Sequence, residues 1–247
     1  MEIKLTKFTA VNYSDWKGQS DLTSINMLKG CLTAPGSALC AFIADFVRHE
    51  IIFIHSHSLF QPSSIMFHHK MPFFDIIPAE ERQFIMEYAE ATRSFIDDEI
   101  PVADRNSVGY LLDFHIHMME CNLLVTQKFI PLETDRHGYT QRGLFVLTPS
   151  HNPSFGKLEI LHGNQKWTYD KDCQSFKEES IQLLSKQEKI MLVLSRSGMS
   201  IKDIARITHR SENTIKTQRQ RAFGKLKANN LDEAITKMDN YSLWGVE

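Results

Sequence analysis

The residues between 200 and 226 combine the side chains that suit a polyanionic ligand. They include seven Lys and Arg residues and only two acidic ones: Lys202, Arg206, Arg210, Lys216, Arg219, Arg221 and Lys225 against Asp203 and Glu212. Ammonium and guanidinium groups can neutralise phosphates, and the interspersed Thr, Asn and Gln side chains carry donors and acceptors that can contact base edges. The segment therefore predicts a surface for a nucleic acid, although a charge run by itself is also typical of a solvated helix face.

The charge of the chain is unevenly distributed. Residues 181–227 contain 11 Lys and Arg and 3 Asp and Glu, whereas the rest contains 17 basic and 27 acidic residues, for a formal net charge of -2 overall. A basic C-terminal part favours a polyanion, and an acidic remainder is repelled by one. This asymmetry predicts two domains with different tasks.

Helix signals recur through the basic part. Ser185 and Glu188 have the spacing of a capping box, an apolar run follows at residues 190–194, and Gly198 is placed to end that helix. Ser200 is expected to cap a short second helix, and Ser211 a third helix with a buried stripe at Ile215, Ala222 and Leu226. A fourth amphipathic stretch covers residues 230–238. The tight turn expected at 208–210 between the second and third helices indicates a helix-turn-helix, whose second helix enters the DNA major groove.

The segment 184–226 resembles the C-terminal DNA-binding domain of LuxR-type transcriptional regulators. The residues in register with that family are Leu184, Ser185, Glu188, Gly198, Ser200, Ile204, Ala205, Ser211, Thr214, Ile215, Lys216, Lys225 and Leu226. Asp203 stands where Glu is usual, and Thr208-His209 replaces a usual Leu-Gly. Histidine tolerates a left-handed backbone better than most residues, so the turn is expected to form. Gln218 replaces a common His, which leaves the target sequence open.

The resemblance implies a role for each polar residue of this segment. Base edges would be read by Lys216, Thr217 and Gln220. Phosphates would be held by Ser200, Lys202, Thr214, Arg219, Arg221 and Lys225, with Arg219 alternatively a partly buried spacer. The fourth helix would mediate dimerisation through Leu231, Ile235 and Met238, for which packing inside the domain is an equal alternative.

A sigma factor is the rival interpretation, because the ending "QRAFGKL" also resembles the promoter-reading domain of those proteins. A sigma factor would need a helical N-terminal region, and the N-terminal part here predicts strands. Two apolar runs at 39–57 are separated by "RHE", a helical pattern follows Pro78, and strand-like runs follow at 108–119, 122–133 and 143–151. This order, with "FFDIIPAEER", resembles a PAS-type sensor domain over roughly residues 38–165.

Histidines raise a third possibility. His55 and His57, like His115 and His117, are two apart and share a strand face, and His68-His69 lies between the pairs. Such pairs can bind zinc, copper or iron, and one imidazole can ligate a haem. No carboxylate or cysteine stands at a diagnostic spacing, so half-buried strand histidines are the preferred interpretation, and neither a metal nor a cofactor is predicted.

The sequence thus predicts an α+β protein: a PAS-like antiparallel sheet with helices at 1–170, including a helical lead-in around residues 21–32, a connector at 171–180 and an all-α four-helix domain at 181–247. We expect a cytoplasmic homodimeric transcription regulator, not an enzyme, that binds double-stranded DNA and RNA polymerase and no membrane. A PAS-like domain that only binds proteins, a sigma-like protein and a metal or haem sensor remain the alternatives. Catalytic motifs such as G-x-S-x-G, a Walker loop or G-x-G-x-x-G are missing from the sequence.

Overall fold

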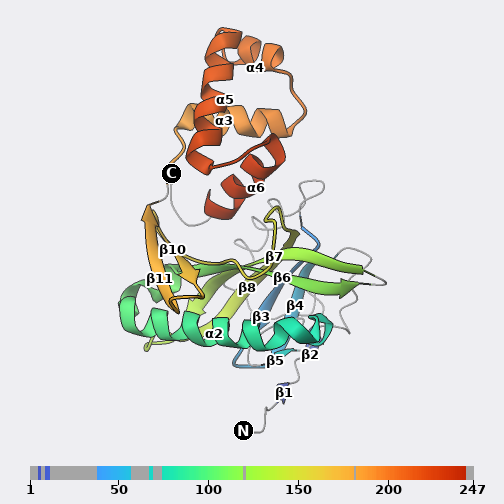
Figure 1. The fold of residues 1–247 in the computed structure, drawn as a ribbon, viewed down its shortest axis with the longest axis vertical. Coiled ribbons are helices and arrows are strands. Elements are labelled where there is room, and N and C mark those ends of the chain that lie inside the picture. Colours follow the sequence, from blue (N-terminus) through green and yellow to red (C-terminus); the bar gives the residue numbers. More distant parts are fainter. Residues whose placement is uncertain are drawn as a thin grey trace. The chain divides into compact units, whose positions relative to one another are not determined.

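A computed structural model describes residues 5–6, 9–11, 38–56, 67–68, 74–118, 121–180 and 182–242. Two compact units divide the chain: residues 1–160 with 167–177, and residues 161–166 with 178–247 (Figure 1). The helical lead-in expected around residues 21–32 lies outside the described residues, as do His57 and His69. Among the described residues, no helix is both long enough and apolar enough to cross a membrane.

The first unit is built on an extended sheet. Nine strands follow the spatial order β11-β10-β9-β6-β7-β8-β3-β4-β2. Their bounds are β2 Thr9–Val11, β3 Cys40–Asp45, β4 Glu50–Ser56, β6 Gly109–Met118, β7 Cys121–Thr134, β8 Thr140–Pro149, β9 Leu158–His162, β10 Gln165–Asp170 and β11 Ser175–Ser180. Pairing is antiparallel from β6 through β7, β8 and β3 to β4, whereas β2 runs parallel to β4. A separate pair joins β1 Leu5–Thr6 to β5 Phe67–His68. Two strands, a helix and a three-stranded meander are the order that the sequence predicted.

The turn between β3 and β4 shows how the polar "RHE" interrupts two apolar strands. The Asp45 carboxylate accepts hydrogen bonds from the backbone N–H groups of Val47 and Arg48, at 3.0 and 2.8 Å. His49 adopts a left-handed backbone with φ 56° and leads into β4. Every residue of β3 is buried, because the strand lies between β8 and β4 in the sheet.

Helix α2, Ala79–Glu99, lies across one face of the sheet (Figure 1). It begins after Pro78, whose fixed φ suits a helix start. Its buried side chains Ile85 and Tyr88 pack into the main core with Phe42, Phe114 and other apolar residues of the strands. Two short 3-10 helices flank α2, η3 Phe74–Ile76 and η4 Val102–Ser107. The face of the sheet under α2 is therefore the main hydrophobic core of this unit.

Strands β9, β10 and β11 lengthen the sheet beyond β6. The segment expected to be a connector, 171–180, forms a turn and then β11. Phe176 anchors β11 to the rest of the unit. The centre of its ring lies 4.5 Å from the ring centre of Phe95 on α2 and 5.0 Å from the ring centre of Tyr169 on β10. One aromatic residue in a polar hexapeptide is a weak sequence signal, since its partners are distant in the chain.

The second unit contains four helices: α3 Lys186–Arg196, α4 Ile201–Ile207, α5 Glu212–Leu226 and α6 Leu231–Ser242. Each contributes apolar side chains to one core, which includes Met191, Ile204, Ile215, Ala222 and Ala234. The three predicted N-caps are confirmed. Ser185 and Glu188 form a complete capping box, and the Ser200 and Ser211 hydroxyls accept hydrogen bonds from the N–H groups of Asp203 and Thr214.

Candidate nucleic-acid interface

The turn between α4 and α5 fixes the helix-turn-helix. After Thr208, the C-cap of α4, His209 takes a left-handed conformation with φ 52°. The backbone N–H of Arg210 then donates to the carbonyl of Ala205 at 2.9 Å, which closes the end of α4. Ser211 follows at once as the N-cap of α5. The expectation that the turn forms with His209 in a left-handed conformation is confirmed.

Helix α5 has two chemically different faces. Ile215, Ala222 and Leu226 are buried in the core of the helical unit. The opposite face exposes Asn213, Lys216, Thr217, Gln220 and Arg221. These five positions follow the i, i+3, i+4, i+7, i+8 spacing of one helix face. A continuous row of donors, acceptors and cations therefore faces outward along α5.

All three predicted base-reading residues lie on this exposed face. Lys216 and Gln220 are one turn apart, and Thr217 lies beside them. The Thr217 hydroxyl donates to the carbonyl of Asn213 at 2.9 Å, so its oxygen can still accept a hydrogen bond from outside. Asn213 shares the face at the first turn of α5 and was missing from the predicted set. Its polar type and its spacing of three from Lys216 were the available signal.

The predicted phosphate-binding residues fall into different environments. Lys202 and Arg221 are exposed. The Ser200 hydroxyl is used inside α4, where it donates to the Asp203 carboxylate at 2.6 Å. That hydrogen bond is the main reason why the pKa of Asp203 lies below its ordinary value. The Thr214 hydroxyl lies 2.9 Å from that of Ser211. Ser200 is thus the N-cap of α4, and Thr214 contacts Ser211, the N-cap of α5.

Lys225 and Arg219 both have partners within the unit. The Lys225 ammonium donates to the Glu188 carboxylate at 2.8 Å and to the Leu183 carbonyl at 3.1 Å. The Arg219 guanidinium is half-buried and lies 5.2 Å from the centre of the Phe223 ring, a cation–π contact. This position agrees with the alternative role predicted for Arg219, that of a partly buried spacer. Arg210, in the turn, is an exposed cation that the predicted set did not include.

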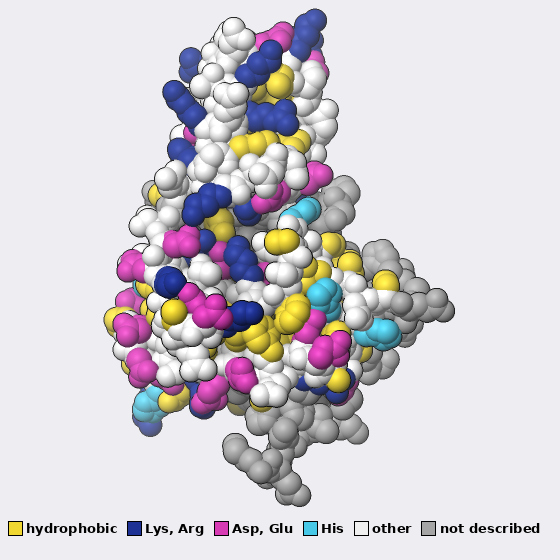
Figure 2. Space-filling model, viewed as in Figure 1, with side chains coloured by type: hydrophobic (Ala, Val, Ile, Leu, Met, Phe, Trp, Pro, Cys, Tyr) yellow, Lys and Arg dark blue, Asp and Glu magenta, His cyan; other side chains and the backbone are white. Residues whose placement is uncertain are grey.

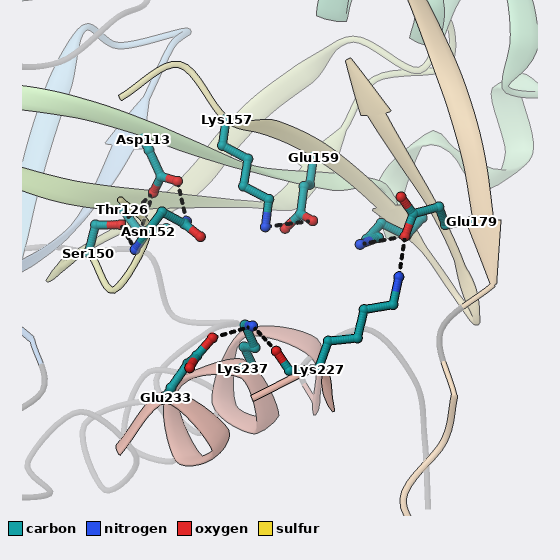
Figure 3. A network of polar contacts seen from close by, with 11 residues as sticks. Asp113, Thr126, Ser150, Asn152, Lys157, Glu159, Glu179, Lys227, Glu233 and Lys237 are labelled. Carbon is teal, nitrogen blue, oxygen red and sulfur yellow. Dashed lines mark hydrogen bonds and ion pairs between the residues drawn. The ribbon is translucent and has the colours of Figure 1, made fainter. Parts of the chain in front are cut away.

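The predicted dimerisation residues lie along α6. Met238 is buried in the core of its own unit, and Leu231 packs against that core. Ile235 is half-buried. Polar contacts hold the helix start: Asn230 accepts a hydrogen bond from the Glu233 N–H at 2.8 Å, and Lys237 bridges Glu233 and the Lys227 carbonyl (Figure 3). Packing inside the domain thus accounts for two of the three apolar side chains.

The histidine pairs are only partly visible. His115 and His117 lie two residues apart on β6, where the His115 ring lies 2.5 Å from the Glu81 carboxylate and the His117 ring 2.9 Å from the Asn122 amide oxygen. Glu81 also accepts the His115 backbone N–H at 2.9 Å, so one carboxylate contacts both the ring and the backbone of His115. Of the described residues, no three His, Cys, Asp or Glu side chains gather as metal ligands. His55 and His68 lie in β4 and β5, and their side chains are outside the described part.

Lys and Arg side chains are spread over the face of the helical unit that Figure 2 shows. Residues 178–226 match the family model described as Sigma-70, region 4. This match spans α3, α4 and α5, so the second unit contains a helix-turn-helix domain of the DNA-binding kind. No curated protein matches the chain.

Three solved structures of VqmA are similar to this chain. The phage VqmA–DPO complex is 14% identical, with 93% of this chain and 94% of that chain covered and a TM-score of 0.26. Two Vibrio cholerae structures, a dimer without target DNA and a ligand–DNA complex, are each 14% identical with 92% and 90% covered and TM-scores of 0.24. The Vibrio cholerae dimer is described as one of the LuxR-type receptors. Superposition at this level is poor, so the fold described above rests on this chain's own strand order and helices.

Proposed function

We propose that this protein is a transcription regulator in which α5 reads the major groove of DNA and the N-terminal unit responds to a signal. The observation that carries the proposal is the exposed row of Asn213, Lys216, Thr217, Gln220 and Arg221 on the second helix of a helix-turn-helix. Such a helix places its side chains against base edges, while cations at its borders contact phosphates. The match of residues 178–226 to Sigma-70, region 4 supports the same use.

Charge supports a DNA partner over a protein one for this surface. Residues 181–227 carry eight more basic than acidic residues, and this excess attracts the phosphate backbone. Lys202, Lys216 and Arg221 are exposed. In the proposal, Lys216 contacts bases, and Lys202 and Arg221 contact phosphates. Lys225 and Arg219 would add positive potential, since both already have partners inside the unit.

The experiment is DNA affinity against salt concentration, with the full chain and a duplex selected from a random library. We expect the affinity to fall steeply as salt rises, because each phosphate contact releases a counterion. Lys216→Glu should abolish selection of a preferred sequence. Lys171→Glu, an exposed residue outside the helical unit, makes the same change in net charge and is the control. Equal binding by both variants would refute the role of α5.

A two-fold DNA site is part of the proposal. A homodimer would present two copies of α5 to half-sites about 34 Å apart, one turn of the DNA helix. Of the three predicted dimerisation residues, Leu231 and Met238 pack in the core of the helical unit and Ile235 does not. Ile235→Asp should lower the mass found by light scattering to that of a monomer, whereas Thr236→Asp beside it should not. An unchanged mass for Ile235→Asp would place the interface elsewhere.

A sigma-like promoter factor is the second candidate, and the family match at 178–226 favours it. Such a protein binds its promoter as part of RNA polymerase, so core enzyme added to the chain should create promoter-specific initiation. The strand-rich N-terminal unit favours a regulator instead, because promoter melting by a sigma factor would require a helical region there. DNA binding by the chain alone, with initiation that still needs a separate sigma factor, supports the regulator over the sigma-like factor.

A further inference from the structure

Asn213 is the first polar side chain on the exposed face of α5. It lies in the first turn of the helix, three residues before Lys216 and seven before Gln220. In helix-turn-helix proteins, residues near the start of the second helix contact base edges in the major groove. In the proposed complex, Asn213 therefore lies among the side chains that face bases.

Neither capping nor packing accounts for an asparagine at this position. The N-cap role belongs to Ser211, whose hydroxyl accepts the Thr214 N–H at 3.1 Å. Asn213 is exposed, and its backbone carbonyl accepts the Thr217 hydroxyl. Within the described part of the chain, however, its side-chain amide has no hydrogen-bond partner. Asparagine is also one of the poorer helix formers. The amide is therefore available to a group outside the chain.

The chemistry of an amide selects one base in the major groove. Adenine presents the N7 acceptor and the N6 donor, which match the NH₂ donor and the carbonyl acceptor of asparagine. Guanine presents two acceptors, so one of them would oppose the carbonyl oxygen of Asn213. An available asparagine amide on a reading helix thus favours adenine.

Lys216 and Gln220 extend this pattern along the groove, and both are exposed. The Lys216 ammonium is a donor alone and suits the two acceptors of guanine, whereas the Gln220 amide suits adenine, as Asn213 does. Three residues rise about 4.5 Å along a helix, and seven rise about 10.5 Å. Base pairs rise about 3.4 Å. The spacing of the three side chains therefore fits the first, second and fourth base pairs of a half-site.

We propose that Asn213 is a specificity-determining residue that reads adenine, so that each half-site contains an A·T pair directly beside the G·C pair read by Lys216. The inference rests on the proposed reading of DNA by α5 and names the sequence that α5 selects. A second A·T pair lies opposite Gln220, two pairs beyond the G·C pair. Arg221, one residue past Gln220, contacts phosphate and adds no base preference.

The test is a selection of duplexes from a random library by the full chain, for the parent and for three variants. Lys216→Ala identifies the G·C pair, because the preference at that pair disappears. At the neighbouring pair, Asn213→Leu keeps the size of the side chain without its donor and acceptor and should remove the preference for adenine. Asn213→Asp offers acceptors alone and should move the preference to cytosine, whose N4 is a donor.

Fluorescence anisotropy on four duplexes that differ only at this pair measures the size of the effect. The parent should bind the A·T duplex at least about fivefold more tightly than the others, the lower end of the discrimination by one bidentate contact. Asn106→Asp, at an exposed position of η4 in the N-terminal unit, makes the same chemical change and should keep the adenine preference. Thermal unfolding confirms that each variant is folded.

A selected site without an A·T pair beside the G·C pair would overturn the inference. An adenine preference that survives in Asn213→Leu or in Asn213→Asp would overturn it as well. In each of these cases the parent still selects a sequence, so the proposed reading of DNA by α5 stands. A parent chain that selects no sequence would instead refute the proposed function, and this inference with it.

Discussion

The Lys225 ammonium lies 2.8 Å from the Glu188 carboxylate and joins the last turn of α5 to the first turn of α3. Glu188 is also half of the capping box of α3, where its carboxylate accepts the Ser185 N–H at 2.7 Å. Burial would raise the pKa of Glu188, but the hydrogen bonds from Lys225 and Ser185 outweigh burial and hold that pKa below its ordinary value. A cation expected to contact DNA thus has a structural role.

Lys225→Met should lower the free energy of unfolding of the helical unit by about 1–3 kcal/mol, because Glu188 loses a donor while buried. A carboxyl whose folded pKa is depressed stabilises the fold above its unfolded pKa, here near 4.5. That stability is lost as pH falls through the lower, folded value. Urea unfolding at pH 7 and pH 3 checks both points. Lys202→Met, which removes an exposed cation, is the control, and an equal loss in both variants would contradict the ion-pair role.

His209→Gly should stabilise the helical unit by about 0.5–1 kcal/mol. The residue has φ 52°, where a side chain strains the backbone and glycine does not. Thr208→Gly is the matched control, since Thr208 has φ -87° and its hydroxyl donates to the Ile204 carbonyl at 2.7 Å. That change should destabilise the unit. Thermal unfolding measures both, and destabilisation by His209→Gly would mean that the imidazole contributes more than the strain removes.

Local signals explain why the helical unit was predictable. Ser185, Ser200 and Ser211 cap helices through bonds to residues three positions away, so the sequence contains both partners within one turn. The succession of two strands, a helix and three strands along residues 39–151 also followed from apolar runs and turn residues. By contrast, Lys225 and Glu188 are 37 positions apart in the chain. Their pairing depends on how α3 packs on α5, and the spacing of apolar residues along each helix does not predict which charged residues of the two helices will meet.

In the N-terminal unit, too, contacts between residues far apart in the chain could not be predicted from the sequence pattern. Phe176 gives β11 its anchor through Phe95, which is far away in the sequence. Gln127 looks like an ordinary polar residue of a strand, and only the assembled sheet shows that its carbonyl is buried without a donor. Contacts between distant elements therefore decide which polar residues are exposed and which are structural.

A buried carboxyl should give the N-terminal unit a pH dependence of the opposite sign. Asp113 accepts hydrogen bonds from Thr126 at 2.5 Å, from Ser150 at 3.1 Å and from the amide of Asn152 (Figure 3). Burial raises the pKa of Asp113 above its ordinary 3.8, and these hydrogen bonds offset only part of that rise. The unfolded chain therefore loses this proton at a lower pH than the folded chain does.

The stability contributed by Asp113 should fall as pH rises from about 3.8 through the raised, folded pKa. In Asp113→Asn this dependence should disappear, so the difference in unfolding free energy between parent and variant should shrink with rising pH in that window. Equilibrium urea unfolding of both chains from pH 3.5 to pH 7 measures the difference. A difference that stays constant or grows with pH would contradict the raised pKa.

Lys216 and Arg221 should differ in what they contribute to DNA binding. Lys216 lies in the middle of the exposed face of α5, between Asn213 and Gln220, where a side chain meets base edges. Lys216→Ala should weaken binding to the preferred sequence by about 1–3 kcal/mol and leave non-specific binding nearly unchanged. Arg221 follows Gln220 nearer the C-terminal end of α5, and the proposal assigns its cation to a phosphate contact. Arg221→Ala should weaken binding to every duplex and reduce the salt slope by about one.

Fluorescence anisotropy on the preferred duplex and on a scrambled one, at several salt concentrations, separates the two effects. Arg206→Ala is a suitable control, because that exposed guanidinium already pairs with Asp203 at 3.2 Å and should change the affinity less. The division of roles requires that the ratio of specific to non-specific affinity change in Lys216→Ala alone. If both variants lose affinity equally on both duplexes, Lys216 contacts the backbone, and base reading must come from Asn213, Thr217 and Gln220.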